Sequence, residues 1–410
     1  MKTLYICYFG LREPLVRTQV LPYLRELARG GIEVSLLSFE PDAKKSWTEE
    51  QAADWRARLL EDGIRWFSLP YHKRPSAPAT LYDILAGARF AARLARREKI
   101  DVLHARAHIP MAMAMLAARM GARSRLVFDI RGLMAEEYAD AGIWAENSAP
   151  FRAIKRIERA GIKRADQIVV LTRAFRDWLV ERRLKSAERI EVIPCCVDFS
   201  LFESVENNDE GARFEVIYAG SVTGLYLLEE MGRFFLELRK RRPDAFFRIL
   251  TVSSPTAAAH VLEGIGLDSE DFWIGAVAPA DVPKFLGRAR LGLSFRKQTF
   301  SQIAASPTKI PEYLAAGLTV VCNAGIGDTD DVVAGQRVGV VLRDLDEASY
   351  RAAVESALAL AGDPQSRVRA ERVARERFDL VKVGGVGYGN VYRRIREGQA
   401  VVETAGEVSA

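Results

Sequence analysis

Short apolar runs that alternate with segments of helical spacing restrict the possible folds of this chain most strongly, and the alternation occurs twice. Parallel strands joined by helical crossovers give this pattern. We therefore predict an α/β protein with two βα domains in tandem. The predicted strands lie within residues 3–10, 32–39, 101–108, 125–132 and 165–172 of the first half, and 214–220, 246–252, 272–277, 291–295, 318–323 and 338–342 of the second.

A polar, acidic connector within residues 195–212 separates the two halves. A length of 410 residues also favours two domains. We predict an N-terminal domain over residues 1–195 and a C-terminal domain over 213–380. A turn and a last helix follow at 381–400, where the helix can pack back across both domains, and residues 401–410 are expected to be a disordered tail.

The composition is that of a globular protein, because 49% of the residues are apolar and 28% are charged. No run of about 18 apolar residues occurs, and the apolar stretch at the N-terminus is too short for a secretion signal. We therefore expect a cytoplasmic protein. The four cysteines, Cys7, Cys195, Cys196 and Cys322, lack C-x-x-C spacing, which favours reduced thiols over disulfides or a zinc site.

The net charge of +5 is unevenly distributed along the chain. Residues 1–200 hold 34 Lys and Arg against 25 Asp and Glu, a net +9, so the remainder carries −4. A basic half beside an acidic half is typical of proteins that bind phosphate-bearing ligands or anionic membranes. Charges that only keep the chain in solution explain so modest an asymmetry equally well.

The stretch from Ser306 to Glu312 combines a proline-bracketed lysine with the start of a predicted helix. A helix that begins at Pro307 or Thr308 keeps Pro311 within the first turn, where proline is tolerated. In open α/β sheets, ligands bind where strand ends lead into helix N-termini. The stretch is therefore the best candidate for a binding site.

The first free N–H groups of this predicted helix belong to Lys309 and Ile310, beside the ammonium of Lys309. Such a group of donors suits a diphosphate. Glu312, one turn later, is placed to accept hydrogen bonds from two neighbouring hydroxyls, as on a ribose. The alternative is an ordinary capped helix with a solvated lysine and glutamate.

Two other strand ends of the second half carry candidate donor-binding residues. Gly220 and Ser221 end one strand and allow the backbone to approach a ligand closely. Arg296 and Lys297 end another and can neutralise the phosphate of a leaving nucleotide, although a solvated basic loop is as good an explanation.

The segment Asp328 to Asp330 has the D-x-D spacing of metal-dependent sugar transferases. Its place at the predicted start of a helix favours a capping role instead. No His, Cys or Asp cluster elsewhere has metal-ligand spacing, and the chain lacks the glycine-rich loops of ATPases and simple NAD enzymes. We predict no metal and no cofactor.

Five motifs, in the order EPLVRTQVLPYLRELARGG, FDIRGLMAEEYADAGIW, IPCCVDFSLF, YAGSVTGLYLL and SPTKIPEYLAAGLTVV, resemble a subgroup of the family 4 glycosyltransferases. The resemblance covers about residues 1–395. It implies the GT-B fold, in which two Rossmann-like domains face a cleft and the last helix crosses back to the N-domain. It also implies a metal-independent, retaining transferase whose C-terminal domain binds a nucleotide-sugar and whose N-terminal domain holds the acceptor.

The chain departs from the family pattern at three positions. Glu312 corresponds to the second glutamate of the family's E-x7-E motif, but the first is replaced by Ala304. Ser221 stands in the segment where many members carry an arginine and then a lysine for the diphosphate. Arg131 stands where many members have a histidine near the reacting sugar.

The resemblance assigns catalytic and acceptor roles to particular residues. The catalytic candidates are Arg131, Asp129 and Lys309, and the donor-binding set is Gly220, Ser221, Arg296, Lys297, Ser306, Pro307, Thr308, Lys309 and Glu312. On the acceptor side we expect Gly10, Arg12, Arg17, His104 and Arg106. The donor set includes three cations because retaining transfer needs mainly stabilisation of the departing diphosphate.

A basic helix predicted at residues 149–166 can lie on anionic lipid, which suits a lipid-linked acceptor. The alternative is that its apolar side packs on the domain and its cations are solvated. The expected partners are a nucleotide-sugar and a glycan or lipid-linked acceptor of cell-envelope polysaccharide synthesis, with peripheral contact to the inner face of the cytoplasmic membrane. Nucleic acid is not expected, and the chain is expected to be a monomer or dimer.

Two rival hypotheses remain open. A nucleotide-sugar epimerase with the GT-B fold would convert its sugar without an acceptor. A catalytically degenerate binding module would fit the departures at Ala304 and Ser221. The donor class, hexosyl or acetylhexosaminyl, and the nucleotide base do not follow from the residues.

Overall fold

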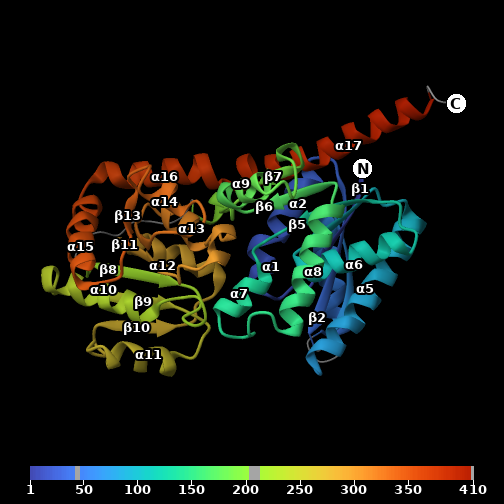
Figure 1. Ribbon diagram of the computed structural model, residues 1–410. Helices are drawn as coiled ribbons and strands as arrows, with labels where there is room; N and C mark the ends of the chain where they lie inside the picture. Colours follow the sequence, from blue (N-terminus) through green and yellow to red (C-terminus); the bar gives the residue numbers. More distant parts are fainter. Residues whose placement is uncertain (42–46, 203–212, 408–410) are drawn as a thin grey trace. The chain divides into compact units, whose positions relative to one another are not determined.

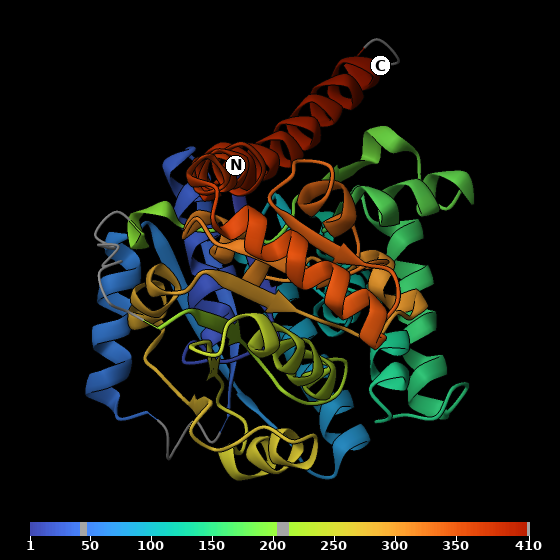
Figure 2. The same cartoon turned by 90° about the vertical axis from the view of Figure 1, so that its left-hand side faces the viewer.

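The computed structural model describes residues 1–41, 47–202 and 213–407 (Figures 1 and 2). Residues 203–212 of the predicted connector and 408–410 of the predicted tail lie outside the described residues. The chain divides into two compact units. Unit 1 comprises Met1–Glu136, Trp144–Pro194 and Gly384–Ala410, and unit 2 comprises Glu137–Ile143 and Cys195–Val383.

Unit 1 is built on a seven-stranded sheet in which every pair of neighbours is parallel. The order is β3-β2-β1-β4-β5-β6-β7. The strands are β1 (Lys2–Cys7), β2 (Glu33–Pro41), β3 (Ile64–Tyr71), β4 (Val102–Arg106), β5 (Arg125–Asp129), β6 (Gln167–Val170) and β7 (Ile190–Val192).

Helices cover this sheet, and the inner strands β4 and β6 are buried along their whole length. Buried strands read as continuous apolar runs, which explains why the sequence pattern identifies them. The helices of the unit are α1 (Pro14–Gln19), α2 (Leu21–Arg29), α4 (Glu49–Glu61), α5 (Ser76–Glu98), α6 (His108–Arg119), α8 (Ala149–Arg164), α9 (Arg173–Glu181) and α17 (Val386–Glu407), with the 3-10 turn η1 (Ala187–Arg189). Helix α7 (Met134–Asp140) crosses from unit 1 into the short segment that belongs to unit 2.

The last helix, α17, packs on unit 1, against α2 and β7. It buries Tyr388 and Tyr392, whose hydroxyls bond to Asp129 at 2.7 Å and to Thr3 at 2.8 Å. The helix continues to Glu407, beyond residue 400, where the sequence pattern predicts its end.

Unit 2 repeats the architecture with a six-stranded parallel sheet in the order β10-β9-β8-β11-β12-β13. The strands are β8 (Glu215–Ala219), β9 (Phe246–Leu250), β10 (Phe272–Gly275), β11 (Leu291–Ser294), β12 (Thr319–Asn323) and β13 (Gly339–Leu342). The prediction of two Rossmann-like α/β sheets is confirmed.

The helices of unit 2 cover both faces of its sheet. Neighbouring residues of β8 belong to different clusters, because Val216 and Tyr218 pack with α10 and α15 while Ile217 packs with α13 and α16. The helices are α10 (Leu228–Arg241), α11 (Pro255–Gly264), α12 (Val282–Arg288), α13 (Lys309–Ala315), α14 (Thr329–Val333), α15 (Glu347–Ala361) and α16 (Pro364–Phe378), with the 3-10 turns η2 (Phe199–Leu201), η3 (Pro279–Asp281) and η4 (Phe300–Ala304).

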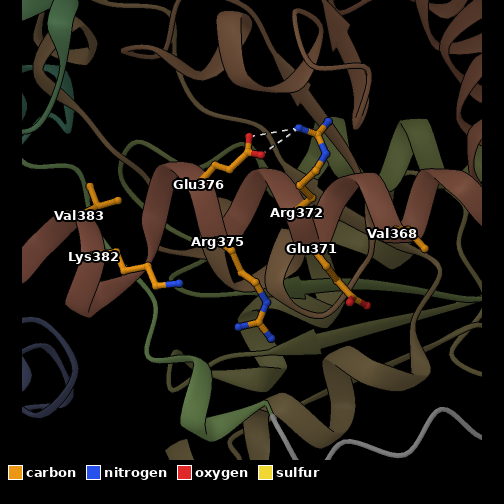
Figure 3. Close-up of a pocket in the computed structure, with 7 residues that line it drawn as sticks. All are labelled: Val368, Glu371, Arg372, Arg375, Glu376, Lys382 and Val383. Atoms are coloured by element: carbon orange, nitrogen blue, oxygen red, sulfur yellow. Dashed lines mark hydrogen bonds and ion pairs between the residues drawn. The ribbon is translucent and has the colours of Figure 1, made fainter.

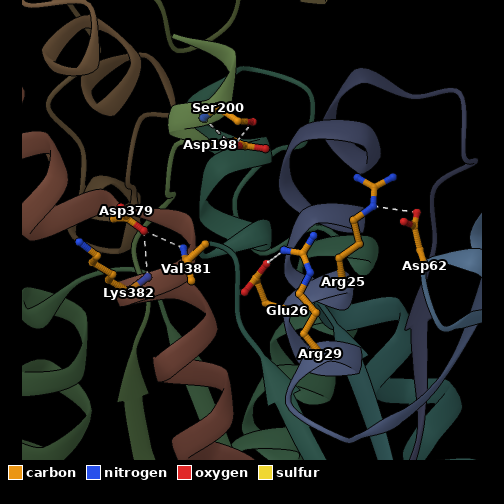
Figure 4. A network of polar contacts seen from close by, with 9 residues as sticks. All are labelled: Arg25, Glu26, Arg29, Asp62, Asp198, Ser200, Asp379, Val381 and Lys382. Atoms are coloured by element: carbon orange, nitrogen blue, oxygen red, sulfur yellow. Dashed lines mark hydrogen bonds and ion pairs between the residues drawn. The ribbon is translucent and has the colours of Figure 1, made fainter. Parts of the chain in front are cut away.

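A π-helical turn, η5 (Leu380–Gly385), follows α16. The carboxylate of Asp379 starts this turn, because it accepts the backbone N–H groups of Val381 at 2.8 Å and Lys382 at 2.9 Å (Figure 4). The same view shows the ion pair between Arg25 and Asp62 in unit 1, which ties α2 to the end of α4.

Each sheet reverses its strand order at one place, between β1 and β4 in unit 1 and between β8 and β11 in unit 2. Ligands of open α/β sheets bind at such reversals, at the carboxyl ends of the strands. The fold therefore directs attention to the loops after β1 and β4 and to those after β8 and β11.

Candidate functional site

Segments that lie far apart in the sequence of unit 2 meet at its strand-order reversal. Gly220 follows β8, Arg296 follows β11, and Lys309 begins α13. A Cβ atom built on Gly220 would lie 3.3 Å from Cε and from Nζ of Lys309. An isolated bridge pairs Tyr226 with Arg296. The structure thus brings the predicted residues Gly220, Arg296 and Lys309 together.

Tyr313 fixes the position of α13. Its ring packs over Gly292 of β11, where any larger residue would collide with it, since a Cβ there would lie 2.4 Å from Cδ2. Its hydroxyl donates to the carbonyl oxygen of Leu293 at 3.2 Å and accepts the N–H of Ala219 at 2.9 Å. One turn earlier, Lys309 is therefore held at the ends of both central strands.

The ammonium of Lys309 is buried without a counter-ion. The residue is 3% exposed, and its Nζ lies 4.4 Å from the ring centroid of Tyr226 and 5.0 Å from that of Tyr218. Within the described part of the chain it has no ion pair or hydrogen bond. Burial, and after it the charge of Arg296, lowers the pKa of Lys309 to about 7, while the charge of Glu312 opposes the shift.

Arg296 is the second cation of this cluster, and it is 8% exposed. Its Nε donates to Oε1 of Gln302 at 2.7 Å and its Nη1 to the hydroxyl of Tyr226 at 3.3 Å. Asn323 fixes the backbone by accepting the N–H of Arg296 and donating to its carbonyl oxygen. Among the described residues no carboxylate forms an ion pair with the guanidinium, so its partners are neutral.

Glu312 completes this group on α13. Burial raises the pKa of Glu312 to about 7, while the neighbouring charge of Lys309 lowers it. The side chain is half-buried, so its carboxyl group has partial access to solvent. Ala304, at the position of the family's first glutamate, is 1% exposed within η4.

The other predicted donor residues have mainly structural contacts. The hydroxyl of Ser306 accepts the N–H of Cys195 at 3.1 Å, and the carbonyl of Ser221 accepts the hydroxyl of Tyr218. Lys297 donates its ammonium to the carbonyl oxygen of Asp140 at 3.2 Å.

The start of α13 differs from the sequence prediction in one respect. The helix begins at Lys309 with Thr308 in the N-cap position, as expected, but Thr308 makes no side-chain capping bond. The N–H of Ile310 is not free, because it donates to the carbonyl oxygen of Pro307 at 3.2 Å. The tight turn at Pro307 thus removes one predicted amide donor.

The D-x-D segment lies at the start of α14, directly after a glycine-rich loop. Asp330 closes the glycine-rich loop by accepting the N–H of Gly325 at 3.2 Å, and Asp328 stands at the N-cap of α14 without a side-chain capping bond. Across the described ranges, no group of three His, Cys, Asp or Glu side chains could hold a metal ion. All four cysteines, which lie within the described residues, are buried, and none of them forms a disulfide.

In unit 1, the predicted residues Asp129, Arg106 and Arg131 form a buried cluster at the ends of β4 and β5. Oδ2 of Asp129 lies 3.7 Å from Nη1 of Arg106, and Oδ1 lies 3.5 Å from Nη1 of Arg131. The hydroxyl of Tyr388 donates to Oδ2 at 2.7 Å. Despite its burial, Asp129 keeps its pKa below the ordinary range because the positive charges of Arg131 and Arg106 and the adjacent ring of His104 stabilise the carboxylate.

His104 lies beside this cluster and is fully buried. Its Nδ1 lies 2.9 Å from the hydroxyl of Tyr392, and its Nε2 lies 3.8 Å from Oδ2 of Asp129. Burial lowers the pKa of His104, so the ring is neutral near pH 7.

The acceptor-side residues after β1 have different surroundings. Gly10 leaves room for Glu40, because a Cβ there would lie 2.8 Å from Oε2. Arg12 stacks on Trp47 and donates to Gln51 at 2.8 Å, and Arg17 is exposed. Glu40, Trp47 and Gln51, the neighbours of Gly10 and Arg12, do not belong to the Asp129 cluster.

One polar cluster was not predicted. Asp83, fully buried on α5, accepts the hydroxyl of Tyr8 at 2.7 Å and the backbone N–H of His72 at 3.0 Å, and its Oδ1 lies 2.6 Å from Nδ1 of His72. The available signal was an aspartate at a core position of α5, between Ala79 and Gly87.

A surface pocket of about 490 Å³ lies on α16 and the following π-helical turn (Figure 3). Its lining contains none of the predicted donor residues. The bidentate pair of Arg372 with Glu376 neutralises part of its charge. The lining residues are Val368, Glu371, Arg372, Arg375, Glu376, Lys382 and Val383.

Residues 16–201 match the family model described as Glycosyltransferase Family 4. No curated protein matches. No described helix has the length and apolar character needed to cross a bilayer.

Several solved structures are similar over nearly the whole chain. Sucrose-phosphate synthase from Thermosynechococcus elongatus has a TM-score of 0.71 at 14% identity, with 97% of this chain and 99% of that chain covered. HepE of Anabaena in complex with UDP has a TM-score of 0.64 at 14% identity, with 99% of this chain and 100% of that chain covered. A UDP-N-acetylglucosamine 2-epimerase described as putative, from Listeria monocytogenes, has a TM-score of 0.63 at 12% identity, with 97% of each chain covered.

These identities show the fold alone, which is the GT-B fold of two Rossmann-like sheets. Together with the family match, the fold supports a glycosyltransferase. The match to the family model lies outside the Lys309 cluster, whose residues all come later in the chain.

Proposed function

We propose that the protein is a retaining glycosyltransferase that takes a sugar from a nucleoside diphosphate sugar and transfers it to a hydroxyl of an acceptor. The observation that carries the proposal is the buried ammonium of Lys309, which lies near Arg296 and forms no ion pair with a carboxylate of the described residues. The charge of Glu312 raises the pKa of this lysine, but the two groups form no ion pair. A buried charge without a partner is costly, and a bound diphosphate removes that cost.

Unit 2 is the donor-binding unit in this proposal. Lys309 and Arg296 hold the two phosphates, and Gly220 lets the backbone approach them. Glu312 accepts the ribose hydroxyls. HepE, a structural neighbour, was solved with UDP and with UDP-glucose, which supports a donor of this class.

The reaction requires stabilisation of the leaving diphosphate. The bond between the anomeric carbon and the phosphate oxygen breaks, and the acceptor oxygen forms a bond to the same face of that carbon. The acceptor proton passes to the departing phosphate oxygen. Lys309 and Arg296 stabilise the negative charge that develops there, which lowers the barrier without a protein base.

Unit 1 is the acceptor-binding unit in this proposal. The Asp129 cluster, with Arg131, is its polar centre, and the acceptor is a glycan or lipid-linked sugar of cell-envelope polysaccharide synthesis. The transferred group is a hexosyl or acetylhexosaminyl group. Transfer without a metal ion is part of the proposal, because Lys309 and Arg296 supply positive charge for the diphosphate.

A second candidate is a nucleotide-sugar epimerase, which the similarity to the putative epimerase of Listeria monocytogenes favours. Incubation with UDP-glucose and with UDP-N-acetylglucosamine, with and without a panel of glycan acceptors, separates the two. Nucleotide release that requires an acceptor supports the transferase, and isomer formation without one supports the epimerase. Binding measured by calorimetry without either reaction would show a degenerate binding module.

A further inference from the structure

Helix α5 of unit 1, labelled in Figure 1, carries three large apolar side chains that are exposed on its first turns. Leu81 is 58% exposed, Tyr82 is 60% exposed and Leu85 is 36% exposed. Leu85 is four residues after Leu81 and three after Tyr82, so the three lie on one side of the helix, and the buried Ala79, Asp83 and Gly87 of the same turns lie on the other. Scattered apolar residues on a surface are ordinary, but three that adjoin one another form a patch that favours an apolar partner.

Cations flank this patch on both sides. Lys73 and Arg74 precede α5, and Arg89 and Arg93 continue the same helical face one and two turns beyond Leu85. All four are exposed, and none of them pairs with a carboxylate of the described residues.

Acidic side chains do not offset these charges within the segment. Between residues 72 and 97 the sequence contains a single acid, Asp83, and it is fully buried and bonded to Tyr8 and His72. The segment therefore presents apolar groups and positive charge together, without negative charge.

Helix α8, which the sequence singled out for membrane contact, has a different surface. Its buried residues include Ile154 and Ile162, and no large apolar residue of α8 is exposed. Lys155 is half-buried and forms ion pairs with Glu158 and Glu136. The helix offers cations such as Arg152 to solvent, but no group that can enter a hydrocarbon layer.

We infer that the α5 patch, Leu81, Tyr82 and Leu85 with the flanking Lys73, Arg74, Arg89 and Arg93, docks on an anionic lipid bilayer. The apolar side chains enter the boundary between head groups and acyl chains, where the ring of tyrosine is favoured. The flanking cations lie at the level of the lipid phosphates. Charge complementarity selects this partner, because the segment has no exposed acid that a bilayer would repel. The inference concerns unit 1 alone and does not depend on the reaction.

The test is sedimentation of the full chain with vesicles of phosphatidylglycerol and phosphatidylcholine, compared with phosphatidylcholine alone. We expect binding to the anionic vesicles that weakens as salt is added. The triple change Leu81→Ser, Tyr82→Ser and Leu85→Ser should lower the affinity about tenfold or more, because it removes the apolar groups that insert. These side chains are exposed, so the fold should be retained, which circular dichroism checks.

A matched pair of charge variants locates the surface. Lys73→Gln, Arg74→Gln and Arg89→Gln removes three cations from the α5 patch, and Arg152→Gln, Arg156→Gln and Arg159→Gln removes three from α8. We expect the first to weaken vesicle binding at least about tenfold and the second to change it by less than about threefold. Equal losses in both, an unaffected serine variant, or no binding to anionic vesicles would each overturn the inference.

The other occupants of the patch have their own signatures. If the patch joined two copies of the chain, the serine variant would lower the molecular mass measured by light scattering. Binding to an acidic protein would leave the vesicle experiment negative. Calorimetric binding of UDP-glucose, measured on the same variants, should stay unchanged. A failure of nucleotide binding in the unaltered protein would count against the proposed function and not against the α5 patch.

Discussion

The two clusters at the strand-order reversals differ in how their charges are balanced. In unit 1, the carboxylate of Asp129 lies within 4 Å of both Arg106 and Arg131, with distances of 3.7 and 3.5 Å. In unit 2, Lys309 and Arg296 lie near each other without a carboxylate in contact with either of them in the described structure. Among the described residues, the first cluster contains a carboxylate that pairs with its cations, and the second does not.

This difference separates a stabilising cluster from a binding cluster. A buried carboxylate with cationic and hydroxyl partners holds its neighbours in fixed positions, and removing it leaves buried cations unpaired. Buried cations that face each other without an anion reduce the stability of the free protein, and an anionic ligand restores it. We therefore expect substitutions in unit 1 to affect mainly folding and those in unit 2 to affect mainly ligand binding.

The largest expected effect is that of Lys309→Met on donor binding. The variant should lose about 3 kcal/mol or more of binding free energy for UDP-glucose, which is at least about a hundredfold in affinity, because the ammonium is desolvated beside the phosphates. The same variant should be more stable than the unaltered protein near pH 7, by about 1 kcal/mol or more, because methionine needs no counter-ion. Calorimetry and urea unfolding measure the two quantities.

Lys297→Met is the matched control for this variant. Lys297 is adjacent to Arg296, but its ammonium donates to a backbone carbonyl and is only half-buried. The Lys297→Met variant should change the affinity for UDP-glucose by less than about tenfold. Similar losses in both variants would mean that net positive charge binds the donor, and the distinction between balanced and unbalanced clusters would fail.

The second prediction addresses the balanced cluster. Asp129→Asn should lower the free energy of unfolding by about 3 kcal/mol, because two buried arginines lose their counter-ion. The affinity for UDP-glucose should be unchanged. Urea unfolding and calorimetry check both statements, and a variant of normal stability would show that Asp129 does not hold the cluster together.

The stability of the unaltered protein should depend on pH through Asp129. The folded pKa of Asp129 lies below its unfolded value near 3.8. Its stabilising contribution is therefore present above that unfolded value and is lost as the pH falls through the folded one. The unaltered protein should lose stability in acid through this residue, and the Asn variant should lack that part of the loss.

The sequence predicts the strands of the buried sheets well, because parallel strands read as apolar runs. It misses β3, whose exposed and buried residues alternate and which contains Pro70, and β7, which has only three residues. β3 and β7 are the two edge strands of the unit 1 sheet. An edge strand is less buried than a central one, so its sequence does not read as a continuous apolar run.

The sequence also predicts which unit 2 segments come together, because Gly220, Arg296 and Lys309 all follow or adjoin strand ends. Sequence spacing alone does not reveal their partners. Tyr226 and Gln302, which hold Arg296, are ordinary residues in the sequence and meet it only through the fold. The contribution of α17 to the Asp129 cluster is equally invisible, since Tyr388 lies 259 residues away from Asp129.

The third prediction uses this long-range contact. Tyr388→Phe removes the hydroxyl that donates to Asp129 at 2.7 Å and should lower the free energy of unfolding by about 2 kcal/mol, as expected for a buried hydrogen bond to a charge. Tyr392→Phe is the control, because its hydroxyl bonds to the neutral Thr3 and His104, and it should cost about 1 kcal/mol. Equal losses, measured by urea unfolding, would show that the charge of Asp129 adds nothing to the contact.

The smallest expected effect is the pH dependence of donor binding, and it tests the unbalanced cluster directly. The pKa of Lys309 is lowered to about 7 in the free protein. A bound diphosphate stabilises the ammonium and raises this pKa, so binding takes up a proton wherever the free lysine is partly neutral. The affinity for UDP-glucose should therefore fall as the pH rises above about 7, by up to about tenfold for each pH unit. Both phosphates of UDP-glucose are esterified, so the charge of the ligand stays constant over this range.

Glu312 also has a pKa of about 7, which burial raises, and its ionisation would weaken diphosphate binding in the same pH range. The variant Glu312→Gln removes that titration and leaves Lys309. If the ammonium controls binding, the affinity of Glu312→Gln for UDP-glucose should still fall with rising pH. The affinity of Lys309→Met should depend on pH only through the ionisation of Glu312. Calorimetry in two buffers of different ionisation enthalpy counts the protons taken up. If the pH dependence disappears in Glu312→Gln, the titrating group is the carboxyl group of Glu312, and Lys309 stays charged throughout this pH range. That result is expected if other groups of the protein already stabilise the ammonium, and it would contradict the unbalanced cluster.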